Sequence, residues 1–183
     1  MFWQITPQIV ARGFVLGDAA ALFMTVDANR NYLRRWLPWL DNIRSVEDYT
    51  IFIRQCQIDA ATGRALTLGL WDGEHCVGVC GFNSLQPIAK LGYWLADGYQ
   101  GRGIIHSVCQ CLIGYGFNQL NLPQIHLQAA VENLNSRAVA ENLGFGLQTT
   151  LPNHEWLYDH FVDHVVYVLQ NPVYCLNTSA PDN

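Results

Sequence analysis

The most chemically suggestive part of the sequence is a glycine-rich turn that precedes a helical pattern. The segment Gly92–Leu95 is followed, after a short loop, by Gln100-Gly101-Arg102-Gly103-Ile104-Ile105. A helix start offers four unpaired N–H groups and a partial positive charge, and glycine lets the backbone approach a pyrophosphate without a Cβ in the way. The pattern therefore predicts an anion site in which backbone amides bind phosphates.

Two other phosphate loops can be compared with this turn. A Walker A loop needs Gly-Lys-Ser or Gly-Lys-Thr, which is absent here, and a dinucleotide fingerprint needs a third glycine where this chain has His106. The turn therefore matches neither motif. Two glycines before a helix are also common as plain turn residues, so the turn alone does not identify a ligand.

The elements that would position the turn alternate between periods of 3.6 and of two residues, which is typical of a mixed α/β domain. Helical patterns follow Asp18, follow Ser45, begin near Gly103 and cover residues 135–143. Asp18, and Ser45 together with Asp48, are the predicted caps of the first two helices. Strands are expected over residues 65–71, 76–85, 90–95, 124–131, 145–150, 154–158 and 163–169. The turn signal Asp72-Gly73 predicts that the first two strands form a hairpin.

Composition describes an ordinary globular protein of 183 residues with a formal net charge of -5. Only ten residues are Lys or Arg, so we expect no nucleic-acid partner, because phosphate contacts need clustered cations. No apolar run approaches the ~20 residues of a membrane helix, and residues 1–10 lack the pattern of a secretory signal. We therefore expect a cytoplasmic protein without a membrane partner, whose six cysteines stay reduced.

The chain contains no linker long enough to divide it. We expect one domain over residues 1–176, followed by a polar, disordered tail over residues 177–183.

The sequence after the glycine-rich helix indicates which class of anion-binding protein this is. Residues 131–145 read Val-Glu-Asn-Leu-Asn-Ser-Arg-Ala-Val-Ala-Glu-Asn-Leu-Gly-Phe. With the Gln-Gly-Arg-Gly-Ile turn, this segment resembles the GNAT acyltransferases, specifically the RimJ/RimL-like branch of ribosomal-protein N-terminal acetyltransferases. The likeness runs from about residue 13 to 169 and is densest over residues 92–145. The Trp-Leu-Pro-Trp stretch within residues 31–39 also resembles that branch, whose members carry a similar stretch beside the acceptor site.

The resemblance implies a GNAT fold, in which a mixed, twisted central sheet splays apart in the middle and carries helices on both faces. The splay would lie between the strands at residues 90–95 and 124–131, with acetyl-coenzyme A in the gap. Phosphates would meet the turn, and the pantetheine arm would pair with strand backbone like an added strand. The residues implied to contact the cofactor are Trp94, Leu95, Gln100, Gly101, Arg102, Gly103, Ile104, Ile105, Asn133 and Ser136.

The resemblance also implies acetyl transfer to an amine by direct attack in a ternary complex. The amine must be uncharged, because a protonated amine has no lone pair. Glu155 stands where the family places a catalytic glutamate and could take a proton directly or through water. The backbone N–H of Leu95 would stabilise the tetrahedral oxyanion, and Ser136 could protonate the leaving thiolate.

Two positions depart from the family pattern. Ala140 stands where many members place a tyrosine that protonates the thiolate. Ala129 stands where some members carry a cysteine, so a covalent acetyl-cysteine step is not supported.

Each candidate residue also has a structural explanation. Leu33, Trp36 and Trp39 are candidates for the acceptor pocket, although both tryptophans would fit core packing equally well. Glu155 could be a solvated strand carboxylate, and Ser136 could cap the helix that follows it.

Three histidines on the late strands, His154, His160 and His164, invite comparison with a metal site. No carboxylate or cysteine stands at a typical ligand spacing from them, so we predict no metal.

The favoured acceptor is the N-terminal α-amine of a protein. Two alternatives are an acetyltransferase for a small amine, such as a polyamine, amino sugar or drug, and a non-catalytic acyl-coenzyme A binder or interaction module. Exposed tryptophans would need cover, which a homodimer would provide.

Overall fold

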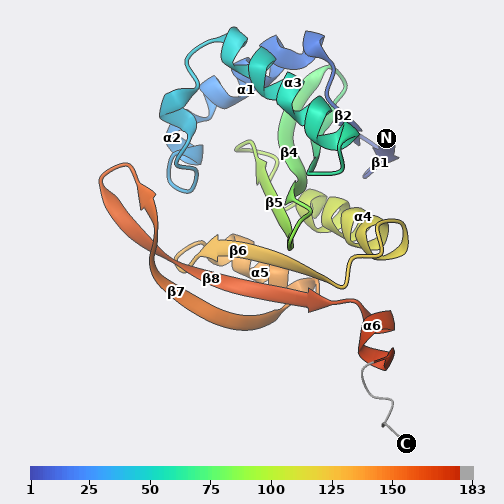
Figure 1. Ribbon diagram of the computed structural model, residues 1–183. Helices are drawn as coiled ribbons and strands as arrows, with labels where there is room; N and C mark the ends of the chain where they lie inside the picture. The colour runs from blue at the N-terminus through green and yellow to red at the C-terminus, as the bar shows by residue number, and fades with distance from the viewer. Residues whose placement is uncertain (178–183) are drawn as a thin grey trace, which may run out of the picture.

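The computed structural model describes residues 1–177, and residues 178–183 of the expected tail lie outside this range. Figure 1 shows the elements, which are β1 (Phe2–Gln4), β2 (Ile9–Gly13), α1 (Ala19–Ala28), α2 (Arg30–Leu33), α3 (Val46–Ala61), β3 (Leu66–Asp72), β4 (His75–Ser84), β5 (Ala89–Leu95), α4 (Ile104–Asn118), β6 (Gln124–Ala130), α5 (Leu134–Asn142), β7 (Gly146–Leu157), β8 (His160–Gln170) and α6 (Pro172–Asn177). Short 3₁₀ turns lie at Leu16–Asp18 and Leu40–Asn42. None of the helices formed by this part of the chain has the length and apolarity to cross a membrane.

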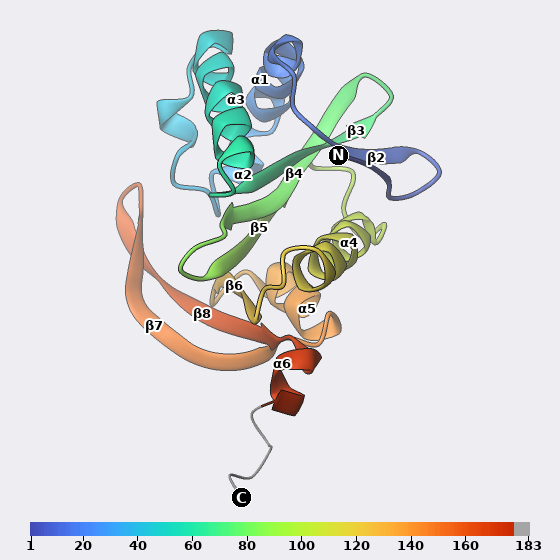
Figure 2. The ribbon, with the colours of Figure 1, turned by 45° about the vertical axis from the view of Figure 1, so that its right-hand side comes forward.

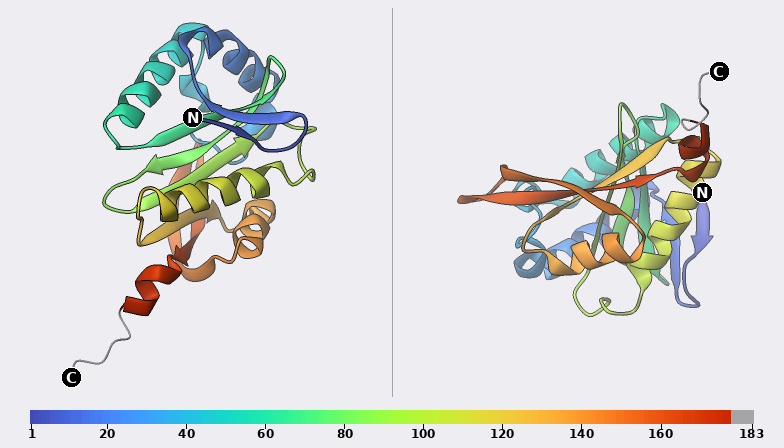
Figure 3. Two further views of the ribbon diagram at one scale, coloured as in Figure 1. Left: turned by 90° about the vertical axis from the view of Figure 1, so that its right-hand side faces the viewer. Right: turned by 90° about the horizontal axis from the view of Figure 1, so that it is seen from below.

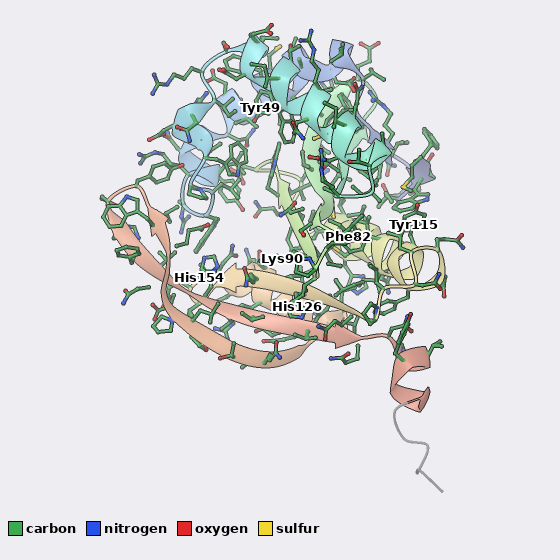
Figure 4. The ribbon with its side chains drawn as sticks, viewed as in Figure 1. Tyr49, Phe82, Lys90, Tyr115, His126 and His154 are labelled. Atoms are coloured by element: carbon green, nitrogen blue, oxygen red, sulfur yellow. The ribbon has the colours of Figure 1, made fainter. Side chains whose placement is uncertain are left out.

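The strands form one mixed sheet that parts in the middle. Its order is β1-β2-β3-β4-β5-β6-β8-β7, and every neighbouring pair is antiparallel except β5 and β6. The β5–β6 pairing extends only over residues 89–91 and 125–127. Figure 4 labels Lys90 and His126, which face each other where the two strands still pair. The expected splay between these strands is confirmed.

Helices cover both faces of the sheet, as expected. Figures 2 and 3 show α1 and α3 on one face of the β2–β5 half and α4 on the other. On α4, Ile104, Val108 and Leu112 are four residues apart and pack into one buried core. On α3, Tyr49 and Ile53 have the same spacing and pack into a second core on the opposite face. The sheet therefore separates two apolar layers.

Two local predictions are confirmed by their geometry. Ser45 Oγ accepts a hydrogen bond from the Asp48 N–H at 3.3 Å, and the Asp48 carboxylate accepts one from the Ser45 N–H at 2.8 Å, which is a capping box. The β3–β4 hairpin turns at Gly73, whose φ of 58° is in the left-handed region that glycine tolerates.

Asp18 stands at the N-cap position of α1, as predicted, but its side chain makes no cap hydrogen bond. Its carboxylate accepts the Val15 N–H at 2.8 Å and pairs with the Arg12 guanidinium at 2.7 Å, so it closes the turn before α1 instead of capping that helix. Burial raises the pKa of Asp18, but the hydrogen bonds from Arg12 and Val15 outweigh it and leave the pKa below its ordinary value.

The late strands also differ from the expectation. Residues 146–157 form the single strand β7, because the pairing with β8 shifts between Leu151 and Glu155 and accommodates Pro152. Inside this irregularity, Asn153 has a φ of 48° and donates its N–H to Asp163 at 2.8 Å. The elements β1, β2, α2 and α6 were not predicted.

The tryptophans are less exposed than the homodimer argument assumes. Trp71 is buried, four others are half-buried, and Trp156 alone among the six has a large exposed fraction, at 52%. Trp156 packs edge-on against Phe161 with ring centroids 4.9 Å apart. The expectation of a homodimer therefore depends on one exposed aromatic pair.

Candidate active site

A cavity of about 710 Å³ opens where β5 and β6 part. It is lined by β5, the turn before α4, the end of β6, the start of α5, and the α2 region on the opposite side. The residues that sequence analysis assigned to the cofactor all line it, namely Trp94, Leu95, Gln100, Gly101, Arg102, Gly103, Ile104, Ile105, Asn133 and Ser136. The fold thus brings residues from 94 to 136 around one opening.

The turn before α4 has the backbone conformation that its glycines allow. Gly101 and Gly103 have φ values of 70° and 72°, and a Cβ on either would meet no protein atom within 4 Å. Gly103 is the N-cap of α4, so the unpaired N–H groups of that helix begin at the cavity. The partial positive charge and the open space beside the glycines suit a phosphate.

Side chains hold this turn in place. Arg102 donates to the Gly98 carbonyl at 2.6 Å, and its guanidinium lies 5.1 Å from the centre of the Tyr99 ring. Tyr99 in turn donates to Asp72 at 3.1 Å. The neighbouring Gln100 Nε2 is buried and has no partner among the described residues, so it is a free donor at the cavity wall.

On β5 the unpaired backbone faces the gap. The Ala96 N–H donates to the Val77 carbonyl at 2.8 Å, and Gly78 is the register partner of Leu95. Antiparallel pairs alternate between hydrogen-bonded and non-hydrogen-bonded positions, so the N–H of Leu95 points away from β4. Because β6 has already separated at this level, that N–H is free for a ligand, whereas the N–H of Trp94 points toward β4.

The start of α5 closes another side of the cavity. Asn133 Oδ1 accepts the Ser136 N–H at 3.2 Å, so Asn133 caps the helix and the alternative that Ser136 caps it is wrong. The Ser136 carbonyl accepts a hydrogen bond from Tyr93, another cavity residue, at 3.3 Å. Of the two departures from the family pattern, Ala129 lines the cavity and Ala140 is buried in the core.

An apolar wall lies across the cavity from the sheet. It is formed by Tyr32, Leu33, Trp36 and Leu37. The tip of the β7–β8 hairpin contacts this wall. The Tyr158 hydroxyl donates a hydrogen bond to the Leu37 carbonyl, and the Arg34 guanidinium lies 3.6 Å from the centre of the Tyr158 ring. Figure 1 shows the hairpin tip beside α2.

The structure separates the candidate acceptor residues. Leu33 and Trp36 line the cavity, whereas Trp39 does not and instead packs against the core beneath α1 and α3. For Trp39, core packing is therefore the observed arrangement.

Glu155 lies next to a histidine that lines the cavity. His164 Nε2 is 3.5 Å from Glu155 Oε2, and His164 is a cavity residue whereas Glu155 is not. Burial raises the pKa of Glu155, partly offset by His154, and burial together with His154 lowers the pKa of His164. Figure 4 shows His154 on the same hairpin. Within residues 1–177, no three His, Cys, Asp or Glu side chains form a metal-binding group.

Sequence reasoning missed several cavity residues. Tyr93 lies within the segment 92–95 and Tyr99 directly precedes the glycine-rich turn, but neither tyrosine was assigned a role. His164 was considered only as a metal ligand, because its place in the cavity depends on the pairing of β8 with β6 and β7.

Comparisons with known proteins agree with this geometry. The acetyltransferase (GNAT) domain family matches residues 8–146. YdaF of Bacillus subtilis (strain 168) is 32% identical over 168 residues, which cover 85% of this chain and 91% of YdaF. The ribosomal-protein-serine acetyltransferase of Escherichia coli (strain K12) is 29% identical over 149 residues, covering 80% of this chain and 83% of that protein.

Among solved structures, the RimL ribosomal L7/L12 alpha-N-protein acetyltransferase in complex with coenzyme A has the same fold. Its TM-score is 0.88 at 23% identity, over 93% of this chain and 98% of that chain. The family match covers well over half of the sequence, and the parted sheet with its glycine turn is present in the structure. This chain belongs to the GNAT acetyltransferase family.

Proposed function

We propose that this protein transfers the acetyl group of acetyl-coenzyme A to the N-terminal α-amine of a protein, of the ribosomal-protein type. The observation that carries the proposal is the cavity in the parted sheet, because all the residues assigned to the cofactor line it. The E. coli relative, a ribosomal-protein-serine acetyltransferase, supports the choice of acceptor.

Cofactor binding would use backbone more than side-chain charge. The amides at the start of α4 and the Gln100 side chain would donate to the pyrophosphate. The pantetheine arm would run along β5, where the N–H of Leu95 lacks a strand partner, and would reach Asn133 and Ser136 at α5. This path leaves the thioester between β5 and the apolar wall.

The cavity lining favours a protein N-terminus over a polyamine. Among the described residues that line the cavity, none is Asp or Glu, and the acceptor side is formed by Leu33, Trp36 and their neighbours. A polyamine carries several positive charges that would need carboxylate partners. An N-terminal residue offers one amine beside a small neutral side chain, which this wall would accept.

The chemistry follows from these positions. A neutral α-amine attacks the thioester carbonyl, and the N–H of Leu95 donates to the oxyanion that forms. Glu155, beside the cavity residue His164, accepts the proton that the amine nitrogen must lose, directly or through water. The tetrahedral intermediate then collapses to the amide, and the hydroxyl of Ser136, which lines the cavity, passes a proton to the leaving thiolate and takes one from water in return.

The test is an acceptor panel with acetyl-coenzyme A, in which release of free thiol is followed. Peptides with a free N-terminus should release thiol and gain one acetyl group by mass spectrometry, whereas the same peptides with a blocked N-terminus should not. Release only with polyamines or amino sugars would instead assign a small-molecule acceptor. Cofactor binding without release from any amine would identify a non-catalytic binder and reject the proposal.

A further inference from the structure

We infer that the hydroxyl of Tyr93 donates a hydrogen bond to the coenzyme A sulfur as it leaves, and so stabilises the thiolate that Ser136 protonates. The inference rests on the proposed acetyl transfer and adds to it a catalytic role for a residue to which sequence analysis assigned none. The proton donor and the proton acceptor of the proposed reaction stay the same.

The first observation is the place of Tyr93 at the parting of the sheet. Leu91 and Leu127 are the last register partners that join β5 to β6. Two residues further along each strand, Tyr93 and Ala129 face the gap from the same side of the sheet, and both line the cavity. Tyr93 therefore lies beside the stretch of β5 along which the pantetheine arm would run.

The second observation is the bond that the Tyr93 hydroxyl makes across the gap. It donates to the carbonyl of Ser136, at the start of α5, at 3.3 Å. An O–H···O bond is usually about 2.7–2.8 Å long, so this one is weak, and a charged acceptor would bind the O–H more strongly. The proposed reaction places Ser136 at the sulfur, so the Tyr93 hydroxyl lies on the sulfur side of the thioester.

The other hydroxyls of the cavity are placed elsewhere. Among the described residues that line it, hydroxyls belong to Tyr32, Tyr93, Tyr99 and Ser136. Tyr32 belongs to the apolar wall on the acceptor side, and Tyr99 donates to Asp72 beside the turn before α4. Tyr93 is thus the residue that can supply a second O–H next to that of Ser136.

The surroundings of Tyr93 keep its hydroxyl protonated. The titratable side chains beside it are Cys80 on β4 and Cys109 on α4, both buried. Burial raises the pKa of Tyr93, the hydrogen bond with Ser136 offsets part of this rise, and the two thiols add to it. Near pH 7 the phenol therefore donates a hydrogen bond and does not act as the acid.

The step balances without a further reactant. When the tetrahedral intermediate collapses, the carbon–sulfur bond breaks and its electron pair stays on sulfur as a thiolate. The Tyr93 O–H turns from the Ser136 carbonyl to this sulfur and keeps its own proton. The Ser136 hydroxyl passes its proton to the sulfur and takes one from water. A hydrogen bond to the charged form lowers a pKa, so Tyr93 should lower the pKa of the bound coenzyme A thiol.

The experiment measures the pKa of the coenzyme A thiol on the protein, which requires no acceptor. The complex is titrated with base while the ultraviolet absorbance of the thiolate is followed, and the complex with desulfo-coenzyme A serves as the blank. The proteins are wild type, Tyr93→Phe, Ser136→Ala and the double variant. Calorimetric titration with coenzyme A and a thermal melt establish that each variant is folded and binds the cofactor.

Tyr115→Phe is the matched control, because it removes a phenol hydroxyl from outside the cavity. Tyr115 lies on α4 and packs edge-on against Trp3 with ring centroids 5.9 Å apart (Figure 4). This variant should match wild type in every measurement.

Tyr93→Phe should raise the pKa of the bound thiol by about 1–2, which is the effect of losing one hydrogen bond to a charged group. The rise should be of similar size in the Ser136→Ala background, because Tyr93 contacts the sulfur directly. With an amine that wild type acetylates, kcat should fall about 10- to 100-fold and the acceptor KM should not change.

Four results would overturn the inference. An unchanged thiol pKa in Tyr93→Phe would make Tyr93 a structural contact to α5, and acetyl transfer would still stand. A rise that disappears in the Ser136→Ala background would mean that Tyr93 only positions Ser136. A raised thiol pKa with unchanged kcat would remove the catalytic role. No thiol release by wild type with any amine would reject the proposed function and this role together, and the thiol pKa would still show whether Tyr93 contacts the sulfur.

If Tyr93→Phe does not fold, a ring-fluorinated tyrosine at position 93 decides. Its hydroxyl is more acidic and donates a stronger hydrogen bond, so the thiol pKa should fall below the wild-type value. An unchanged thiol pKa would refute the contact.

Discussion

Replacing Gly101 with alanine tests whether the turn before α4 binds the cofactor phosphates. Gly101 has a φ of 70°, and the left-handed region is unfavourable for alanine by about 1–2 kcal/mol. A Cβ at this position would meet nothing within 4 Å, so this backbone term is the only expected destabilisation. For a chain of this size it corresponds to a fall in Tm of about 2–8 °C.

The effect on binding should be larger than the effect on stability. The alanine would either move the turn amides or place its Cβ against a phosphate, and losing one hydrogen bond to a charged group is unfavourable by about 1.5–3 kcal/mol. This corresponds to acetyl-coenzyme A binding about 10- to 150-fold more weakly, measured by calorimetric titration.

Gly63→Ala is the matched control for this experiment. Gly63 has a φ of 66°, an added Cβ there would also meet nothing within 4 Å, and it does not line the cavity. Both variants should melt at lower temperature, and only Gly101→Ala should lose affinity. Equal affinity in the two variants, whether unchanged or reduced, would refute the assignment of the phosphates to this turn.

Other positions give independent tests. Trp36→Ala should raise the KM for the acceptor about tenfold without changing the Kd of acetyl-coenzyme A, because this side chain lines the acceptor side of the cavity. Trp39→Ala should lower Tm and leave the acceptor KM unchanged, because Trp39 packs against the core. A raised acceptor KM in Trp39→Ala but not in Trp36→Ala would contradict the placement of Trp36 at the acceptor site. Asp18→Asn should destabilise the protein by about 2–3 kcal/mol in urea denaturation, because it leaves Arg12 without its charge partner. The folded pKa of Asp18 lies below its ordinary value, since hydrogen bonds from Arg12 and Val15 outweigh burial. The carboxylate therefore stabilises the fold above about pH 4, and this contribution is lost as pH falls through the folded pKa, a loss that Asp18→Asn should lack.

The parts of the fold that could be predicted from the sequence depend on residues close together in the chain. The Ser45–Asp48 capping box, the hairpin turn at Gly73 and the glycine turn before α4 each consist of a few adjacent residues whose conformation follows from their own chemistry. The parted sheet itself was predicted from the family resemblance, and the short pairing between β5 and β6 confirms it.

The features that were missed depend on contacts between distant segments. Pro152 is tolerated inside β7 because the irregular pairing with β8 accommodates it, and no local signal reveals that pairing. Asp18 bonds to Arg12 and Val15 on its N-terminal side, so its side chain makes no cap hydrogen bond to α1. The position of His164 in the cavity wall depends on which residues of β6 and β7 it meets across the sheet.

The short contact between β5 and β6 also affects the stability of the whole protein. Only three residue pairs join the two parts of the sheet, so a cofactor that adds hydrogen bonds along β5 would fasten them together. A ligand at 100 times its Kd stabilises the folded state by about 2.7 kcal/mol. The protein without bound coenzyme A or acetyl-coenzyme A would therefore have a larger unfolded fraction, and proteases would cleave it faster than the cofactor-bound protein.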